Sequence, residues 1–238
     1  MDNKTLFDRF LDFFYINRCL GCARILPEAD SVLCPYCRMR YRLLHHRKCR
    51  ECGRDLCTCE CTKQGIESLG VWRLGKLCAY LPSERNTPLM RMLYFFKHKN
   101  NRASLELFAS EMADMIGQRC SCVDFTICYV PRSVVSYKKY GYDHMRELSY
   151  LVAQKLGIEC ESLFFRDKKA RVQKDLGRAA RFYNAQQSIM LREVQVSERR
   201  FILLDDVCVT GASLGRCASL LIGEGAREVR CFVIAVRP

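Results

Sequence analysis

The segment F-I-L-L-D-D-V-C-V-T-G-A-S, residues Phe201–Ser213, contains the clearest structural pattern in the sequence. Four apolar residues are followed by two adjacent carboxylates, Asp205 and Asp206, and then by a loop of small residues. This order predicts a buried strand that passes through a tight loop into the N-terminus of a helix. Because ligands of parallel α/β sheets bind beyond the carboxyl ends of the strands, we expect a ligand site at this point.

The loop after the two carboxylates has the composition of a phosphate site. Backbone N–H groups at a helix N-terminus attract anions, and Thr and Ser hydroxyls add further donors. The residues that we expect to bind phosphate are Val209, Thr210, Gly211, Ala212 and Ser213. Asp205 and Asp206 suit instead the hydroxyls of a sugar, or a magnesium ion that bridges to them. The segment therefore predicts a ribose 5-phosphate site; the alternative is an ordinary strand end that happens to carry two acidic residues.

The sequence around this stretch alternates between short apolar runs and helical patterns. Residues 125–130 and 201–204 are short apolar runs typical of strands, and residues 228–236 are expected to form a closing strand. A helix is expected from the cap Asp143 to Gly157, and another follows Ser213 and ends at Gly223 or Gly225. This alternation over residues 65–238 predicts an α/β domain, with a parallel sheet and flanking helices.

A cysteine-rich segment precedes this domain. The chain has 17 cysteines, and nine of them lie between Cys19 and Cys61. Two C-x-x-C knuckles place four thiolates around one zinc ion, which predicts a structural zinc held by Cys19, Cys22, Cys34 and Cys37. A second zinc would take Cys49, Cys52 and two of the next three cysteines. The spacing does not distinguish these three, and we assign Cys57 and Cys61. Residues 1–64 are thus expected to form an N-terminal helix and a zinc module.

The N-terminus and the overall charge bear on location and partners. Residues 6–16 are apolar but interrupted by Asp8, Arg9 and Asp12, which favours an amphipathic helix docked on the protein over a signal peptide. A helix at a membrane surface or on a partner is the alternative. No apolar run is long enough to span a membrane. Thiolates kept for metal indicate a reducing cytoplasm, with peripheral attachment at the inner face of the membrane as a variant. The net charge of +13 suits nucleic acid, a polyphosphate or simply a soluble surface.

The Phe201–Ser213 segment resembles the 5-phosphoribosyl-1-pyrophosphate (PRPP) signature of type I phosphoribosyltransferases, with V-T-G-A-S in place of the more usual T-T-G-A-T. The resemblance implies a type I phosphoribosyltransferase-like sheet and a glycosyltransferase that uses PRPP with Mg²⁺. It also implies that the catalytic pair Asp205 and Asp206 holds the ribose hydroxyls. The loop from Val209 to Ser213 would then cup the 5-phosphate.

Other blocks resemble the competence protein F (ComF) family, which includes the GntX-like proteins. V-P-R-S at 130–133 and Y-K-K-Y-G-Y-D-H at 137–144 are similar to its V-P … R-G-F-N-Q segment. Three further parts of the sequence are similar to other blocks of that family: residues 173–184, the L-Y-F-F-K-H-K segment around Lys97 and the cysteine knuckles. Tyr140 stands where the family has Arg, and Asp143-His144 where it has Asn-Gln. We give His144 no catalytic role.

The departing pyrophosphate requires positive charge, which we expect from Lys97, Arg132, Lys138 and Lys139. The basic stretch from Arg166 to Arg181 is expected to be a flap over the site or a solvated helix. The family resemblance implies a phosphoribosyltransferase with an unidentified acceptor that acts in natural competence and DNA uptake. The alternatives are a non-catalytic factor that binds single-stranded DNA among DNA-uptake proteins, and a PRPP sensor.

Overall fold

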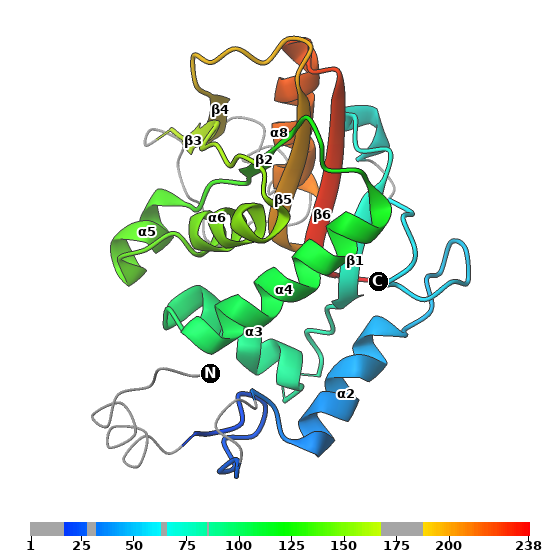
Figure 1. Ribbon diagram of the computed structural model, residues 1–238, viewed down its shortest axis with the longest axis vertical. Coiled ribbons are helices and arrows are strands. Elements are labelled where there is room, and N and C mark those ends of the chain that lie inside the picture. Colours follow the sequence, from blue (N-terminus) through cyan, green and yellow to red (C-terminus); the bar gives the residue numbers. More distant parts are fainter. Residues whose placement is uncertain (1–16, 28–31, 63–65, 85, 168–187) are drawn as a thin grey trace.

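A parallel sheet forms the centre of the molecule (Figure 1). The structure, a computed structural model, describes residues 17–27, 32–62, 66–84, 86–167 and 188–238. The strands follow the order β1-β6-β5-β2, and every neighbouring pair is parallel. Their bounds are β1 Leu74–Ala79, β2 Phe125–Tyr129, β5 Arg200–Cys208 and β6 Glu228–Val236. The predicted α/β class with a parallel sheet is confirmed. β5 continues through Asp205 and Asp206 rather than ending at them.

Helices cover both faces of this sheet. Their bounds are α2 Pro35–His45, α3 Pro88–His98, α4 Arg102–Arg119, α5 Val134–Tyr140, α6 His144–Leu156 and α8 Ala212–Gly223. The 3-10 helix η1 spans Glu67–Leu69, and a separate antiparallel pair joins β3 Phe164–Arg166 to β4 Ile189–Leu191. As predicted, Asp143 caps α6, and Gly157 ends it in the left-handed conformation.

The side chains of β5 alternate between two apolar cores. Ile202 and Leu204 belong to the core that α2, α3, α4 and α6 share with the sheet. Phe201 and Leu203 belong to the core on the opposite face, which includes residues of α8 and of the β3–β4 pair. Successive residues of a strand point to opposite faces, so a strand covered on both sides is apolar throughout. This explains the uninterrupted apolar run that precedes Asp205.

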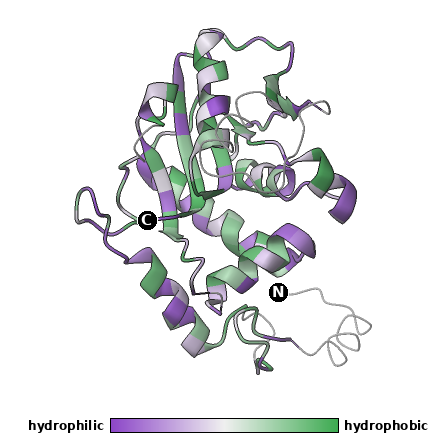
Figure 2. Cartoon of the chain, turned by 180° about the vertical axis from the view of Figure 1, so that it is seen from behind, coloured by the Kyte–Doolittle hydropathy of each residue, from purple (hydrophilic) through white to green (hydrophobic). Residues whose placement is uncertain are grey.

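The cysteine-rich segment contributes to both cores. Tyr41 and Leu44 of α2 join the first core, and Leu56 joins the second. Figure 2 shows hydrophobic and hydrophilic residues side by side on α2. The division after residue 64 stays a prediction. The predicted N-terminal helix and residues 168–181 of the predicted flap lie outside the described residues. Among the helices that the structure describes, none is long and apolar enough to span a membrane.

Candidate functional site

A pocket of about 300 Å³ lies at the carboxyl ends of β2 and β5. Both Asp205 and Asp206 line it, together with residues of the loop after β2 and the beginnings of α6 and α8. The charged and polar side chains that line it include Lys97, Arg132, Ser133, His144, Arg166, Asp205, Asp206 and Ser213. The strand order brings them together, because parallel neighbours end at the same edge of the sheet. The structure therefore has a polar pocket where the sequence predicts the ligand site.

Asp206 is held by two partners in this pocket. Lys97 Nζ lies 2.9 Å from Asp206 Oδ1, and His144 Nε2 lies 2.5 Å from Asp206 Oδ2. The side chain of Asp206 is only 14% exposed. Burial alone would raise its pKa, but the Lys97 ammonium and the His144 hydrogen bond outweigh burial and hold the pKa of Asp206 well below its usual range. Asp206 is therefore a stable carboxylate with both oxygens engaged.

Asp205 has the opposite character. Its Oδ1 accepts a hydrogen bond from the backbone N–H of Asp206 at 2.9 Å. Burial, and then repulsion from the Asp206 carboxylate, raise the pKa of Asp205 to about 7. Two adjacent carboxyl groups whose pKa values are pushed apart can take different roles at neutral pH. A ligand hydroxyl or a cation near Asp205 would favour its ionised form.

Arg166 brings a partly buried positive charge to the start of α8. Its Nη2 donates to Ser213 Oγ at 3.3 Å, and its Nη1 donates to Ser188 Oγ at 2.9 Å. Its Nε donates to the carbonyl of Pro131 at 2.9 Å, on the loop that follows β2. Burial lowers the pKa of Arg166, with nearby acidic groups opposing it. The guanidinium thus connects β3, the loop after β2 and the predicted phosphate loop.

The start of α8 has the backbone geometry that an anion site requires. Gly211 has φ 75°, and a Cβ at this residue would lie 2.4 Å from the Ile66 side chain, so the turn requires glycine. Of the α-helices within the described residues, only α8 begins without a side-chain cap. The Ala212 N–H donates to Thr210 Oγ1 at 3.3 Å, which leaves the following N–H groups of the first turn to a ligand. Of the predicted phosphate residues, Ser213 lines the pocket, whereas Val209, Thr210 and Gly211 form the preceding turn and Ala212 begins α8.

Of the four basic residues predicted to bind pyrophosphate, only two line the pocket. Lys97 and Arg132 line the pocket. The Arg132 guanidinium donates to the carbonyls of Lys97 and Tyr142 at 2.6 and 3.1 Å, so it also ties α3 to the turn between α5 and α6. Lys138 and Lys139 lie on α5 outside the residues that line the pocket. Their positive charge contributes to the surface near the site rather than to its wall.

Two residues of the site were missed or misplaced by the sequence analysis. His144, given no role there, is 7% exposed and bonds Asp206, and its ring packs edge-on against Phe96 at 5.0 Å between centroids. The sequence signal was its position directly after the cap of α6, where the resembling family carries Gln. Arg166 was assigned to a flap, yet it is partly buried and lines the pocket. No sequence pattern indicated that contact.

Two clusters of cysteines have the arrangement of zinc sites. The sulfur atoms of each cluster lie within 4.8 Å of one another, and the clusters are Cys19, Cys22, Cys34, Cys37 and Cys49, Cys52, Cys59, Cys61. Four thiols at this separation fit tetrahedral zinc. The first set is the one predicted. At Gly21, in the first knuckle, a Cβ would lie 2.7 Å from the Cys37 sulfur, so the knuckle closes tightly around its centre.

The second set corrects the sequence assignment, because Cys59 takes the place given to Cys57. Cys59 is fully buried, and its sulfur lies 3.4 Å from that of Cys52. The backbone of Cys57 is tied to other elements instead: its N–H donates to the carbonyl of His45, and its carbonyl accepts from Arg119. Tertiary contacts with α2 and α4 thus decide which of the three neighbouring thiols joins the cluster.

No protein-family model matches the sequence, and no curated protein matches it. Distant solved structures do. An allosteric regulatory enzyme of purine biosynthesis is 18% identical with TM-score 0.39, over 59% of this chain and 29% of that one. Glutamine phosphoribosylpyrophosphate amidotransferase from B. subtilis is 17% identical with TM-score 0.39, and the match covers 59% of this chain and 30% of that one. Adenine phosphoribosyltransferase from Leishmania tarentolae is 12% identical with TM-score 0.37, and the match covers 58% of this chain and 73% of that one. The match spans less than a third of the first two proteins, and likenesses this weak carry no conclusion about this chain.

Proposed function

We propose that this chain is a ComF-like phosphoribosyltransferase that binds PRPP with Mg²⁺. The observation that carries the proposal is the placement of Asp205 and Asp206 in one pocket with Ser213, in the first turn of α8. Carboxylates suit ribose hydroxyls, and the helix N-terminus suits the 5-phosphate. Ser213, in the first turn of α8, lines the same pocket as the two carboxylates. Its hydroxyl accepts a hydrogen bond from Arg166.

In the proposed reaction, pyrophosphate leaves C1 of the ribose while an acceptor nucleophile adds to it. Mg²⁺, when bound with PRPP, would neutralise charge on the leaving group. The chain would contribute Lys97 and Arg132 at the pyrophosphate end of the pocket. The carboxylate of Asp206, kept ionised by Lys97 and His144, would orient the ribose. Positive groups fixed in place before the reaction stabilise charge that develops in the transition state.

The zinc clusters would act structurally in this proposal. A Cβ at Gly21 would lie 3.0 Å from Pro88 Cβ, so the first knuckle packs against the start of α3. α3 carries Lys97 near its other end. Zinc in this knuckle would therefore fix the helix that supplies the Asp206 partner. Structural zinc of this type contributes folding free energy directly.

A second candidate is PRPP binding without turnover. Lys97 pairs with Asp206 and Arg132 donates to backbone carbonyls, so both cations already have partners within the protein. These contacts would suit a competence factor that senses PRPP without turning it over. The net charge of +13 would suit binding of single-stranded DNA by the same factor. Catalysis, by contrast, requires Lys97 or Arg132 to exchange a protein partner for pyrophosphate.

The test is calorimetric titration of the full chain with PRPP and Mg²⁺. We expect binding that is lost in Asp205→Asn/Asp206→Asn, which keeps side-chain shape, and kept in Asp124→Asn, an exposed carboxylate outside the pocket. Equal binding by all three proteins would contradict the proposed site. Phosphorus NMR of PRPP with candidate acceptors then separates the two functions, because release of pyrophosphate supports a transferase. Binding without release, coupled to salt-sensitive affinity for single-stranded DNA, supports the sensor.

A further inference from the structure

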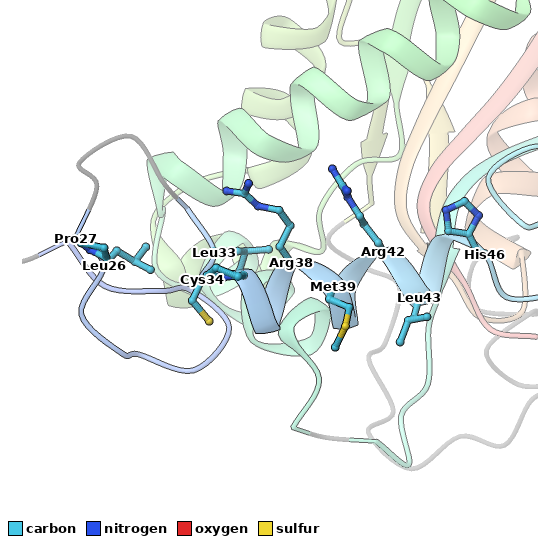
Figure 3. A pocket seen from close by; sticks show the side chains of 10 residues that line it. Leu26, Pro27, Leu33, Cys34, Arg38, Met39, Arg42, Leu43 and His46 are labelled. Carbon is cyan, nitrogen blue, oxygen red and sulfur yellow. The ribbon is translucent and has the colours of Figure 1, made fainter.

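A second hollow, of about 590 Å³, runs along α2 and shares no residue with the PRPP pocket (Figure 3). We call it the α2 groove. Its apolar walls come from Met39 and Leu43 of the helix and from Leu26, Pro27 and Leu33 of the preceding segment. Its polar walls come from Arg38, Arg42 and His46. In Figure 3, Met39 and Leu43 project from one side of α2 and the two arginines from the other.

α2 presents two apolar sides, and only one of them is covered. Cys37, Tyr41 and Leu44 are buried against the body of the protein. Met39 and Leu43, which also line the groove, are 53% and 62% exposed. A surface helix normally buries its apolar stripe and leaves polar residues outside. A second apolar stripe next to a hollow therefore indicates a surface that another segment covers.

The charges of the α2 groove point to an acidic occupant. Arg38 and Arg42 are four residues apart on one helix, a spacing at which like charges repel. Neither guanidinium forms an ion pair with a carboxylate in the part of the chain that the structure describes. Two acidic side chains with the same spacing, carried by an apolar segment, would complement the groove in both charge and hydrophobicity.

The chain itself contains such a segment, immediately before the first described residue. Residues 5–16 read T-L-F-D-R-F-L-D-F-F-Y-I, with apolar residues recurring every three or four positions. Asp8 and Asp12 are four residues apart, like the two arginines. The carbonyl of Asn17 accepts the N–H of Leu26 at 2.9 Å, so the segment joins the described chain at the edge of the groove. Twelve residues with helical rise would extend about 18 Å, close to the length of α2.

We propose that residues 5–16 cover the α2 groove, with their apolar side on Met39 and Leu43 and with Asp8 or Asp12 paired to Arg38 or Arg42. The N-terminal segment is then an intramolecular cover for the zinc module. This proposal does not depend on PRPP binding, because the groove and the PRPP pocket are lined by different residues.

The first test is a charge exchange in the full chain, followed by thermal unfolding and amide hydrogen exchange. Arg38 is chosen because Arg42 also acts on the partly buried Glu111. We expect Arg38→Glu to lower the unfolding midpoint and to speed amide exchange in α2. Adding Asp8→Lys or Asp12→Lys should restore both values. If neither restores them, or if Glu28→Lys/Asp30→Lys does so instead, the proposal is wrong.

The second test uses the apolar contact. Leu43→Asp and Phe10→Asp should each destabilise the chain, and together they should cost less than their sum, because each breaks the same contact. Val123→Asp, at a residue 68% exposed and outside the groove, is the matched control and should add fully to Phe10→Asp. Additive costs for Leu43 and Phe10 would contradict the proposal. So would binding of the unmodified chain to phosphatidylglycerol vesicles that Phe10→Asp abolishes.

Discussion

His144 Nε2 lies 2.5 Å from Asp206 Oδ2, although 62 positions separate the two residues in the sequence. The contact joins the first residue of α6 to the carboxyl end of β5. Lys97, from α3, holds the other carboxylate oxygen at 2.9 Å. Three elements thus converge on one buried carboxylate. Its charge and orientation therefore depend on the packing of α3 and α6 against the sheet.

Replacing His144 tests whether this hydrogen bond prepares the site. We expect His144→Gln to keep PRPP affinity near that of the unmodified chain, because an amide can still donate to Asp206. His144→Phe should leave a buried oxygen without its donor and cost about 1–3 kcal/mol of stability. Calorimetry with PRPP and thermal unfolding of both variants measure the two effects. Equal loss in both would contradict the expectation that an amide can replace the imidazole as the donor to Asp206.

Replacing Lys97 removes the cation closest to the carboxylate pair. We expect Lys97→Met to lower the free energy of unfolding by about 1–3 kcal/mol at pH 7, since a buried carboxylate loses its ion pair and the Lys97 side chain is only partly shielded from water. Lys138→Met, on α5 outside the pocket, should change it by less than about 0.5 kcal/mol. Denaturant titration compares them. A larger effect of Lys138 would contradict the assignment of Lys97 as the partner of Asp206.

The buried contact between α2 and α4 predicts a pH dependence. Tyr41 donates to Glu111 Oε2 at 2.5 Å, and burial raises the pKa of Glu111 from 4.5 to about 7, with the hydrogen bond opposing it. Because the folded pKa lies above the unfolded value, this group stabilises the fold fully below pH 4.5. That contribution should be lost as the pH rises through 7.

The change in the free energy of unfolding is limited by the difference between the folded and unfolded pKa values of Glu111, at about 1.4 kcal/mol per pKa unit. Glu111→Gln keeps an acceptor for Tyr41 and should flatten the loss of stability between pH 4.5 and 7. Asp205 titrates in the same range, since its pKa is also raised to about 7, so only the difference between the variant and the unmodified chain is informative. Parallel curves for the two proteins would show that Glu111 does not titrate in this window.

Zinc content distinguishes Cys59 from Cys57. We expect two zinc ions per chain in protein purified without chelator, and one in Cys59→Ser, because that thiol belongs to the second cluster. Cys57→Ser, two residues away and outside the cluster, is the matched control and should keep both. Loss of zinc should also destabilise the variant, since metal binding is coupled to folding. Loss of zinc from Cys57→Ser alone would restore the assignment made from sequence.

Much of the fold could be predicted from the sequence because its signals are local. β6 matches its expected bounds, β2 ends one residue earlier, and α6 begins and ends at its expected caps, Asp143 and Gly157. A strand buried on both faces must be apolar throughout, and a helix that ends in a left-handed residue favours glycine. The sequence also revealed the two carboxylates that follow the apolar run of β5, and the first cysteine cluster. Each of these is a pattern over adjacent or closely spaced residues.

The sequence alone thus indicated strands β2, β5 and β6, helices α6 and α8, the position of the candidate site along the chain and the first cysteine cluster. Only the tertiary structure decided that His144 and Arg166 line the pocket, that Lys138 and Lys139 do not, and that Cys59 rather than Cys57 completes the second cluster. These outcomes depend on how α3, α5 and α6 pack on the sheet and on the contacts that fix Cys57. Contacts between residues far apart in the chain leave no periodic trace in the sequence, because burial and charge pairing are set by the assembled fold.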